Sequence, residues 1–171
     1  MKVHLLLSLM IVLCASSAAF SQSAAHFSGE WIADAKRSRL SDTSDELVSM
    51  TMQVKTTPNS IEWYKDGKIR PKSNPSNIRD WSKGDTYSLD GKPHDNQLYP
   101  TLKVTNIGVI KDGRILITKN YERRNAMSNA VESRTKNHIG LELLEGGKVL
   151  RMYESYELNG KPHEEIYFVR K

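Results

Sequence analysis

After residue 26 the sequence alternates between apolar and polar residues, and short turns separate the alternating runs. Successive side chains of a β-strand point to opposite faces, so this pattern is typical of strands with one buried face. The turns KDG (111–113) and EGG (145–147) favour β-hairpins, because glycine adopts positive φ freely. We interpret these runs as strands: 26–34, 47–54, 61–65, 85–89, 101–110, 114–122, 132–144, 148–158 and 164–170. The near absence of helical periodicity argues against folds in which helices alternate with strands.

Consecutive strands joined by short turns form an antiparallel meander, and a long meander removes its edges by closing into a barrel. We therefore predict an all-β protein, an antiparallel up-and-down meander barrel of 8 to 10 strands. An antiparallel ring needs an even number of strands, so we expect 61–65 or 85–89 to be irregular, or the last strand to lie beside the first. The long connections 34–46 and 66–83 are first and third, so they share one end, which we expect to be the mouth.

The first residues have the three parts of a secretory signal peptide: a basic start, the apolar run LLLSLMIVLCA at 5–15, and a segment of small polar residues. The apolar run is shorter than the ~20 residues that a membrane-spanning helix needs. We predict residues 1–21 to be the signal peptide and 22–171 to be one β-barrel domain. The protein is then exported to a periplasm or the extracellular space, and it is not an integral membrane protein.

Cleavage after Ser21 fits the small-residue rule best, with Ala19 and Ala25 as alternatives. Cys14 raises the alternative of a lipoprotein, although Leu13 stands where such proteins carry a small residue. Because Cys14 leaves with the signal peptide, no disulfide is expected in the mature chain.

The positive charge of the chain is concentrated in one segment. Loss of Lys2 with the signal peptide leaves 24 Lys and Arg against 20 Asp and Glu. Residues 65–83 hold six of the basic residues but only Asp66 and Asp80 as acidic ones. A basic face that extends over a whole domain is the mark of nucleic-acid binding, so we predict no nucleic-acid partner.

The motif FSGEW places Gly29 and Trp31 on the first strand, and YSLDGKP follows at 87–93. With these motifs the chain resembles the lipocalins and the wider calycin group, and more closely small exported bacterial lipocalin-like proteins. The resemblance implies structural roles for Gly29 and Trp31, with the tryptophan packed at the closed end under a late-strand arginine. Arg170 and Arg151 are the candidates, with Arg170 preferred. The chain lacks the T-D-Y string, the helix and the cysteine pair of the vertebrate proteins, so retinoid or odorant ligands do not carry over.

The segment YSLDGKPHDN at 87–96 is repeated as YELNGKPHEE at 156–165. In a series of nine strands these segments fall in the fourth and eighth connections, which places His94 and His163 at one end, opposite the mouth. A metal site would need further ligands such as Asp95, Glu164 and Glu165. Spacings such as H-x-H do not occur, so we predict no metal and no cofactor, and we interpret the repeat as one turn used twice. His138 alternates with charged residues and is expected to face solvent.

The function predicted from these features is binding of a small hydrophobic or amphipathic molecule, neutral or anionic, without catalysis. No G-x-S-x-G motif or cysteine nucleophile occurs in the mature chain, and no catalytic residue is assigned. The expected ligand contacts are inward-facing residues and the basic segment at the mouth: Met50, Met52, Trp63, Tyr121, Met152, Lys68, Arg70, Lys72 and Arg79.

Two other functions stay open at this point. The barrel interior can be filled by its own side chains, and the protein then acts through its surface as an envelope or interaction protein. A barrel isomerase or cyclase is the other, and it needs a polar side chain in the cavity, for which Asn106, Lys119 and Arg134 are the candidates.

Overall fold

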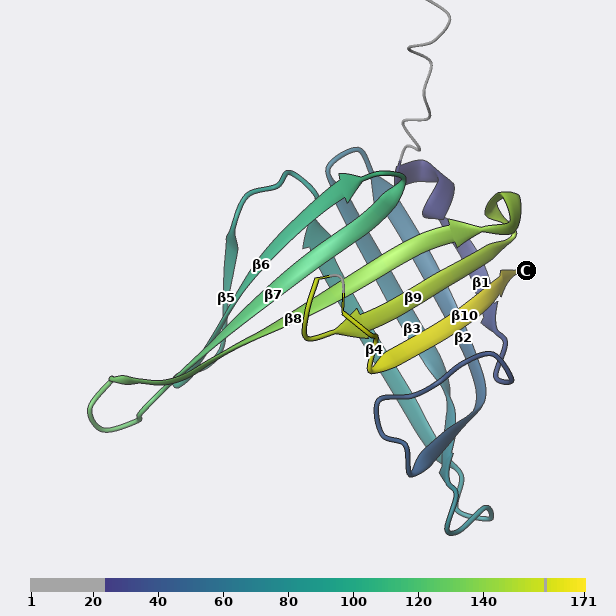
Figure 1. The fold of residues 1–171 in the computed structure, drawn as a ribbon, viewed down its shortest axis with the longest axis horizontal. Helices are drawn as coiled ribbons and strands as arrows, with labels where there is room; N and C mark the ends of the chain where they lie inside the picture. Colours follow the sequence, from purple (N-terminus) through teal and green to yellow (C-terminus); the bar gives the residue numbers. More distant parts are fainter. Residues whose placement is uncertain (1–23, 159) are drawn as a thin grey trace, which may run out of the picture.

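The computed structural model describes residues 24–158 and 160–171 as an antiparallel sheet of ten strands in the order β4-β3-β2-β1-β10-β9-β8-β7-β6-β5 (Figure 1). The predicted signal peptide lies outside the described residues. The elements are η1 (Ala24–Phe27), β1 (Gly29–Ala33), β2 (Asp45–Thr57), β3 (Ser60–Pro71), β4 (Arg79–Ser88), β5 (His94–Tyr99), β6 (Leu102–Lys111), β7 (Arg114–Arg124), β8 (Val131–Leu144), η2 (Glu145–Gly147), β9 (Val149–Ser155) and β10 (Glu164–Arg170).

Every strand pairs with its neighbour in sequence except across the β4–β5 connection, and β1 also pairs with β10, where Trp31 lies opposite Arg170. The sheet therefore curls into a nearly closed meander barrel, and the predicted fold class is confirmed. β4 and β5 are left as the two edges of the sheet.

The strand prediction was wrong in two places. β5 was not predicted, because its sequence HDNQLY is exposed on both faces and does not alternate. Segments 61–65 and 85–89 are not irregular but belong to the long strands β3 and β4, which leaves only 72–78 as the connection between them. Polar residues extend both strands beyond the apolar core, where water reaches both faces and alternation of apolar residues is no longer needed.

The extra strand also corrects the positions of the two histidines. His94 still follows the fourth connection, but His163 now lies in the ninth, so the two lie at opposite ends of the barrel. His94 Nε2 bonds to Asp90 at 2.9 Å, whereas His163 stacks on Tyr156 with ring centres 4.3 Å apart. The repeated segment is therefore one turn sequence used at two different ends, and its histidines do not form one site.

One half of the barrel interior is closed and filled. The hairpin turns β2–β3, β4–β5, β6–β7 and β8–β9 lie at this closed end together with η1. Trp31 is fully buried there, its Nε1 donates to the carbonyl oxygen of Phe27 at 3.1 Å, and Arg170, not Arg151, covers its ring at 4.5 Å. The core around it consists of fully buried side chains: Phe27, Met52, Ile61, Ile115, Leu141, Leu150 and Phe168. Each buried side chain of this size stabilises the fold by about 1.5–3 kcal/mol, so the closed half holds the barrel together.

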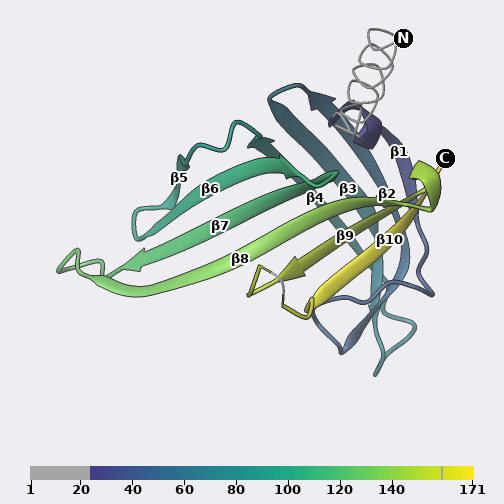
Figure 2. The ribbon, with the colours of Figure 1, turned by 45° about the horizontal axis from the view of Figure 1, so that its top comes forward.

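The other half opens as a mouth. Both views show β5–β8 running out to one side as an arm while β2–β4 run in another direction, so the walls of the barrel diverge (Figures 1 and 2). We use "arm" for the mouth halves of β5–β8 with their two connecting hairpins. The first and third connections lie at this end, as predicted.

His138 does not face solvent, which corrects the prediction. It is 8% exposed, and its Nδ1 lies 3.0 Å from the Thr118 hydroxyl on the neighbouring strand. Gly140, two residues along β8 on the same face, is covered by the ring of Tyr153. Large side chains thus cover part of the outer wall, which alternation within one strand does not reveal.

Candidate functional site

Edge strand β4 approaches β6, the neighbour of edge strand β5, near the closed end, along what we call the seam. The Gly91 amide donates to the Gly108 carbonyl oxygen at 2.9 Å, which joins the β4–β5 turn to β6. A Cβ atom at Gly108 would lie 2.2 Å from the Ser88 carbonyl oxygen, so glycine is required for this approach of β4 to β6. Farther toward the mouth one side-chain bond crosses the seam, from Lys119 Nζ to the Tyr87 hydroxyl at 2.8 Å.

A pocket of about 480 Å³ lies along the seam on the mouth side of this bond. Its walls come from strands at both ends of the sheet order. The residues that line this seam pocket are Lys83, Asp85, Thr86, Tyr87, Asn96, Gln97, Leu98, Val104, Asn106, Lys119 and Tyr121. A volume of this size accommodates a small organic molecule, since ligand pockets span roughly 300–1,000 Å³.

Polar side chains cross the barrel interior at the level of the pocket and form a belt above the apolar core. They occupy inward positions of β3, β4, β6, β7, β8 and β9: Lys65, Asp85, Asn106, Lys119, Asn137 and Glu154. Few of them pair with each other directly. Asn137 donates to Glu154 at 2.9 Å, while Oδ1 of Asn106 and of Asn137 are buried without a hydrogen-bond partner among the described residues.

Lys65 is the most buried member of this belt, at 2% exposure. Among residues 24–158 and 160–171 its ammonium forms no hydrogen bond or ion pair, and it lies 5.0 Å from the centre of the Trp81 ring. Burial lowers the pKa of Lys65, while the more distant carboxylates of Glu164 and Glu154 oppose this effect. A buried lysine that has an aromatic ring but no hydrogen-bond or ion-pair partner is costly for a fold, which marks this level of the barrel as a candidate functional site.

The pKa values of Lys119 and Tyr87 are also shifted by burial and by the charges of the belt. Burial lowers the pKa of Lys119, with Asp85 opposing the shift and Lys83 adding to it. Burial also raises the pKa of Tyr87, and the carboxylate of Asp85 raises it further, so the phenol keeps its proton. Lys83 Nζ lies 3.5 Å from Asp85. The lining therefore presents two ammonium groups against one carboxylate, a net positive lining for a ligand.

The apolar residues expected to contact a ligand are packed in the core. Met50, Met52, Trp63 and Met152 are all buried, and none of them lines the seam pocket. Of the residues expected to contact a ligand, Tyr121 alone lines the seam pocket, where burial raises its pKa.

The basic residues expected at the mouth are engaged elsewhere. Arg70 pairs with Glu46, and Arg79 pairs with Asp45 at 2.7 Å. Lys72 Nζ donates to the Thr43 carbonyl oxygen at 2.7 Å, and Lys68 is exposed. These contacts tie β3 and β4 to the start of β2 on that side of the mouth. Nothing brings these four cations to the seam pocket, so their expected role in ligand binding stays a prediction.

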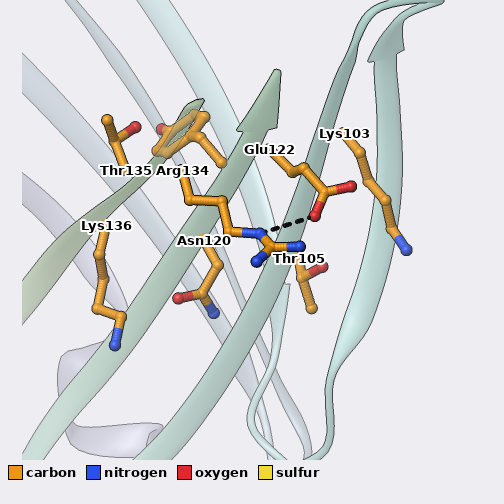
Figure 3. Close-up of a pocket in the computed structure, with 8 residues that line it drawn as sticks. Lys103, Thr105, Asn120, Glu122, Arg134, Thr135 and Lys136 are labelled. Carbon is orange, nitrogen blue, oxygen red and sulfur yellow. Dashed lines mark hydrogen bonds and ion pairs between the residues drawn. The ribbon is translucent and has the colours of Figure 1, made fainter. Parts of the chain in front are cut away.

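Of the three polar residues considered for an enzyme, Asn106 and Lys119 line the seam pocket and Arg134 does not. Arg134 lies in a smaller pocket of about 300 Å³ on the outer face of β6–β8. Its Nε donates to Glu122 at 3.0 Å, beside Lys103 and Lys136 (Figure 3). Among the residues that line the outer pocket, Arg134 bonds to Glu122 across strands, while Lys103 and Thr105 bond to Asp95 outside it.

Sequence reasoning missed Lys65 and Asp85 as site residues. A signal was present, because Lys65 continues the inward parity set by Ile61 and Trp63 on the same strand. The DGK sequence that follows Lys65 is typical of a turn, which hides the continuation of the strand to Pro71.

Metal ligation is not suggested by the geometry. Within the part of the chain that the structure describes, no three side chains of His, Cys, Asp or Glu are grouped so that they can hold an ion. In that same part, no helix has the length and apolar character needed to cross a membrane.

Comparisons of the chain with protein-family models, with curated protein sequences and with solved structures found no match. The assignment of function therefore rests on the geometry of the barrel and its seam pocket.

Proposed function

We propose that the protein is an exported, lipocalin-like binding protein that holds a small amphipathic molecule with an acidic head group in the seam pocket. The observation that carries this proposal is the position of Lys119 and Lys83 in the pocket lining, at the level where the barrel interior changes from apolar to polar. Gly29, Trp31 and Arg170 at the closed end agree with the resemblance to lipocalins.

The shape of the site determines how such a ligand lies. The packed core of the closed half leaves no room for an apolar tail below the belt. The head group therefore bonds to Lys119 and Lys83, while the tail runs toward the mouth along Leu98, Val104 and Tyr121. Asn106, whose Oδ1 has no partner among the described residues, supplies a further bond to a hydroxyl or to the protonated form of the acid.

The proposal is tested with a matched pair of ligands, dodecanoate and dodecanol, titrated against the purified protein. Tryptophan fluorescence reports binding, since Trp63 lies 5.0 Å from the Tyr87 ring of the pocket. We expect saturable binding of both, with dodecanoate bound more tightly. Lys119→Met removes a charge-assisted bond of about 1.5–3 kcal/mol and weakens dodecanoate binding by about tenfold to a hundredfold, with little effect on dodecanol.

Lys68→Met is the control, because Lys68 is an exposed lysine that does not line the pocket. Absence of saturable binding of either ligand would refute the proposal. Equal losses for dodecanoate and dodecanol in Lys119→Met would show that the lysine acts on the fold and not on the acidic head group.

A second function is favoured by the Lys119–Tyr87 pair itself. An amine with a lowered pKa is suited to imine formation with a carbonyl compound, in which the nitrogen adds to the carbonyl carbon and its two protons leave with the carbonyl oxygen as water. The Tyr87 hydroxyl accepts a hydrogen bond from the Lys119 nitrogen and holds it in position at the pocket. Incubation with decanal and cyanoborohydride tests it by mass spectrometry. Reduction of an imine at Lys119 in preference to the exposed Lys68 supports this function, and labelling in proportion to exposure refutes it.

A further inference from the structure

Exposed apolar side chains are distributed unequally between the two ends of the barrel. Four of the connections at the mouth carry or adjoin them: Ile78 before β4, Leu98 and Tyr99 at the end of β5, Met127 and Val131 at the β7–β8 hairpin, and Tyr156 and Leu158 before β10. By the same measure, the closed end has in the described part of the chain only Ile110, next to the 112–113 turn, and Val169, opposite the start of β9, at 37% and 41% exposure. Single exposed apolar residues need no explanation, but their accumulation at one end does.

The β7–β8 hairpin is built to present its apolar residue. Asn125 Oδ1 accepts the amides of Met127 at 2.9 Å and Ser128 at 3.0 Å, and the Asn125 amide donates to the Ala130 carbonyl oxygen at 2.8 Å. The turn is therefore fixed without any contribution from the Met127 side chain, which is 97% exposed. A polar residue would serve this turn equally well, so folding does not explain the methionine.

Two neighbouring hairpins form the tip of the arm. The Arg124 amide donates to the Thr101 carbonyl oxygen at 2.8 Å, which joins the β7–β8 hairpin to the β5–β6 turn. Tyr99 is 65% exposed on that turn. Figure 2 shows these hairpins projecting from the body of the barrel at the mouth. Tyr99 and Met127 therefore lie at a protruding tip and not on the wall.

The charge of the tip is positive. From residue 120 to residue 136 the chain carries four cations, Arg123, Arg124, Arg134 and Lys136, against Glu122 and Glu132, a net charge of +2. Glu122 already accepts Arg124 and Arg134. Arg123 is exposed and, within the described residues, forms no ion pair. Cations beside exposed apolar side chains match the negative head groups and the hydrocarbon boundary of an anionic lipid surface.

We propose that the mouth end docks onto an anionic membrane surface, with the arm tip (Leu98, Tyr99, Met127 and Val131) inserted at the head-group boundary. The apolar residues stand on separate hairpins around an opening, which suits a fluid interface better than a flat protein surface. Tyr99 and Tyr156 have the amphipathic rings that are enriched at such interfaces. Docking brings the seam pocket to the membrane, but the proposal does not depend on a ligand in that pocket.

The test is co-sedimentation of the purified protein with vesicles of phosphatidylcholine alone or with a minority of phosphatidylglycerol. We expect binding to the mixed vesicles that weakens with added salt, and much weaker binding to phosphatidylcholine. Met127→Ser is expected to reduce the partition coefficient about fivefold, and Tyr99→Ser with Met127→Ser about twentyfold or more, because each removes apolar surface from the interface. Arg123→Gln is expected to weaken binding to the vesicles that contain phosphatidylglycerol and to leave binding to phosphatidylcholine alone unchanged.

Matched controls are exposed residues away from the tip. Ile110→Ser and Val169→Ser remove apolar side chains that are exposed on β6 and β10, and Lys111→Gln removes an exposed cation near the closed end. All three are expected to bind vesicles as the unchanged protein does. Equal losses in the controls, or no sedimentation with mixed vesicles, would overturn the proposal.

Self-association through the tip is a separate outcome of the same experiment. A dimer in solution that Tyr99→Ser with Met127→Ser dissociates, without vesicle binding by the unchanged protein, would assign the tip to a second copy and overturn membrane docking. Dodecanoate binding is measured in parallel with the tip variants and is expected to be unchanged. If Lys119→Met loses dodecanoate binding while the tip variants keep it, a defect in ligand binding is distinguished from a defect in membrane docking.

Discussion

Replacement of Lys65 by methionine is expected to stabilise the protein. Lys65 is 2% exposed and has no hydrogen-bond or ion-pair partner among the described residues, and only the Trp81 ring at 5.0 Å offsets part of the cost of its burial, while methionine keeps a similar length and volume without the charge. Burial of a polar group without compensation costs about 1–3 kcal/mol in proteins, so we expect a gain of this size in the free energy of unfolding at neutral pH. In a domain of this length each kcal/mol raises Tm by about 2–4 °C.

The gain should depend on pH, with a sign that follows from the lowered pKa of Lys65. Below the folded-state pKa the lysine is protonated in both states, and the fold bears the full cost of the buried charge. Between that pKa and the unfolded value of about 10.4, the unfolded state binds more protons, so the stability of the unchanged protein rises with pH. The advantage of Lys65→Met is therefore largest at low pH and shrinks as the pH rises through this window.

Four charged groups face Lys65 and shift the pH window in which this gain changes. Glu164, Glu154 and Asp85 raise the pKa of Lys65, and Lys83 lowers it. Loss of Lys65 also removes a favourable neighbour of the three carboxylates, which opposes the gain.

Urea denaturation of the unchanged protein and of Lys65→Met, at several pH values, measures the difference. Lys68→Met, on the exposed face of the same strand, is the control and should change the free energy of unfolding by no more than about 0.5 kcal/mol. A variant less stable than the unchanged protein, or a gain that does not vary with pH, would contradict the argument that Lys65 is an uncompensated buried charge.

Three further predictions concern the fold. Phe168→Ala, at a fully buried core position, should lower the free energy of unfolding by about 3–5 kcal/mol, measured by urea denaturation. Gly140→Ala would place a Cβ atom 2.1 Å from the Tyr153 ring and should cost about 1–3 kcal/mol, which Tyr153→Leu in the same chain should partly restore. Burial, the largest cause, and Lys136 lower the pKa of His138, so stability should fall as the pH drops below about 6.5. His138→Gln should flatten this fall between about pH 8 and pH 5, and an unchanged slope would exclude His138 as its cause.

The closed half of the barrel was predictable from the sequence because one physical rule operates there. Alternation identifies strands wherever one face is buried and the other is wet, as in β2, where Met50, Met52 and Val54 face the core. The motif around Gly29 and Trp31 identified the first strand for the same reason, since Trp31 is fully buried.

The mouth half was not predictable in this way, because water reaches both faces of its strands. β5 has six exposed residues and no alternation, so nothing in its sequence distinguishes it from a loop. Its omission placed His163 at the wrong end and left the seam unseen. The site was hard to predict for a related reason. Lys65 and Lys119 occupy inward positions of their strands, but the sequence of one strand does not show whether an inward lysine lies in the core or in a pocket, because that depends on strands far away in the sequence.

The seam itself explains how a barrel of this kind can keep two free edges. Edge strands invite pairing with other chains unless they are short, charged or covered. β5 is six residues long and polar over its first four positions, and β4 carries Lys83, Asp80 and Asp85 along the opposite edge. These charged and short edges disfavour the addition of another strand, so the edges stay unpaired beside the seam pocket. The gap between the unpaired edges adds a side opening to the mouth, and it places the proposed site at Lys119 between strands from the two ends of the sheet.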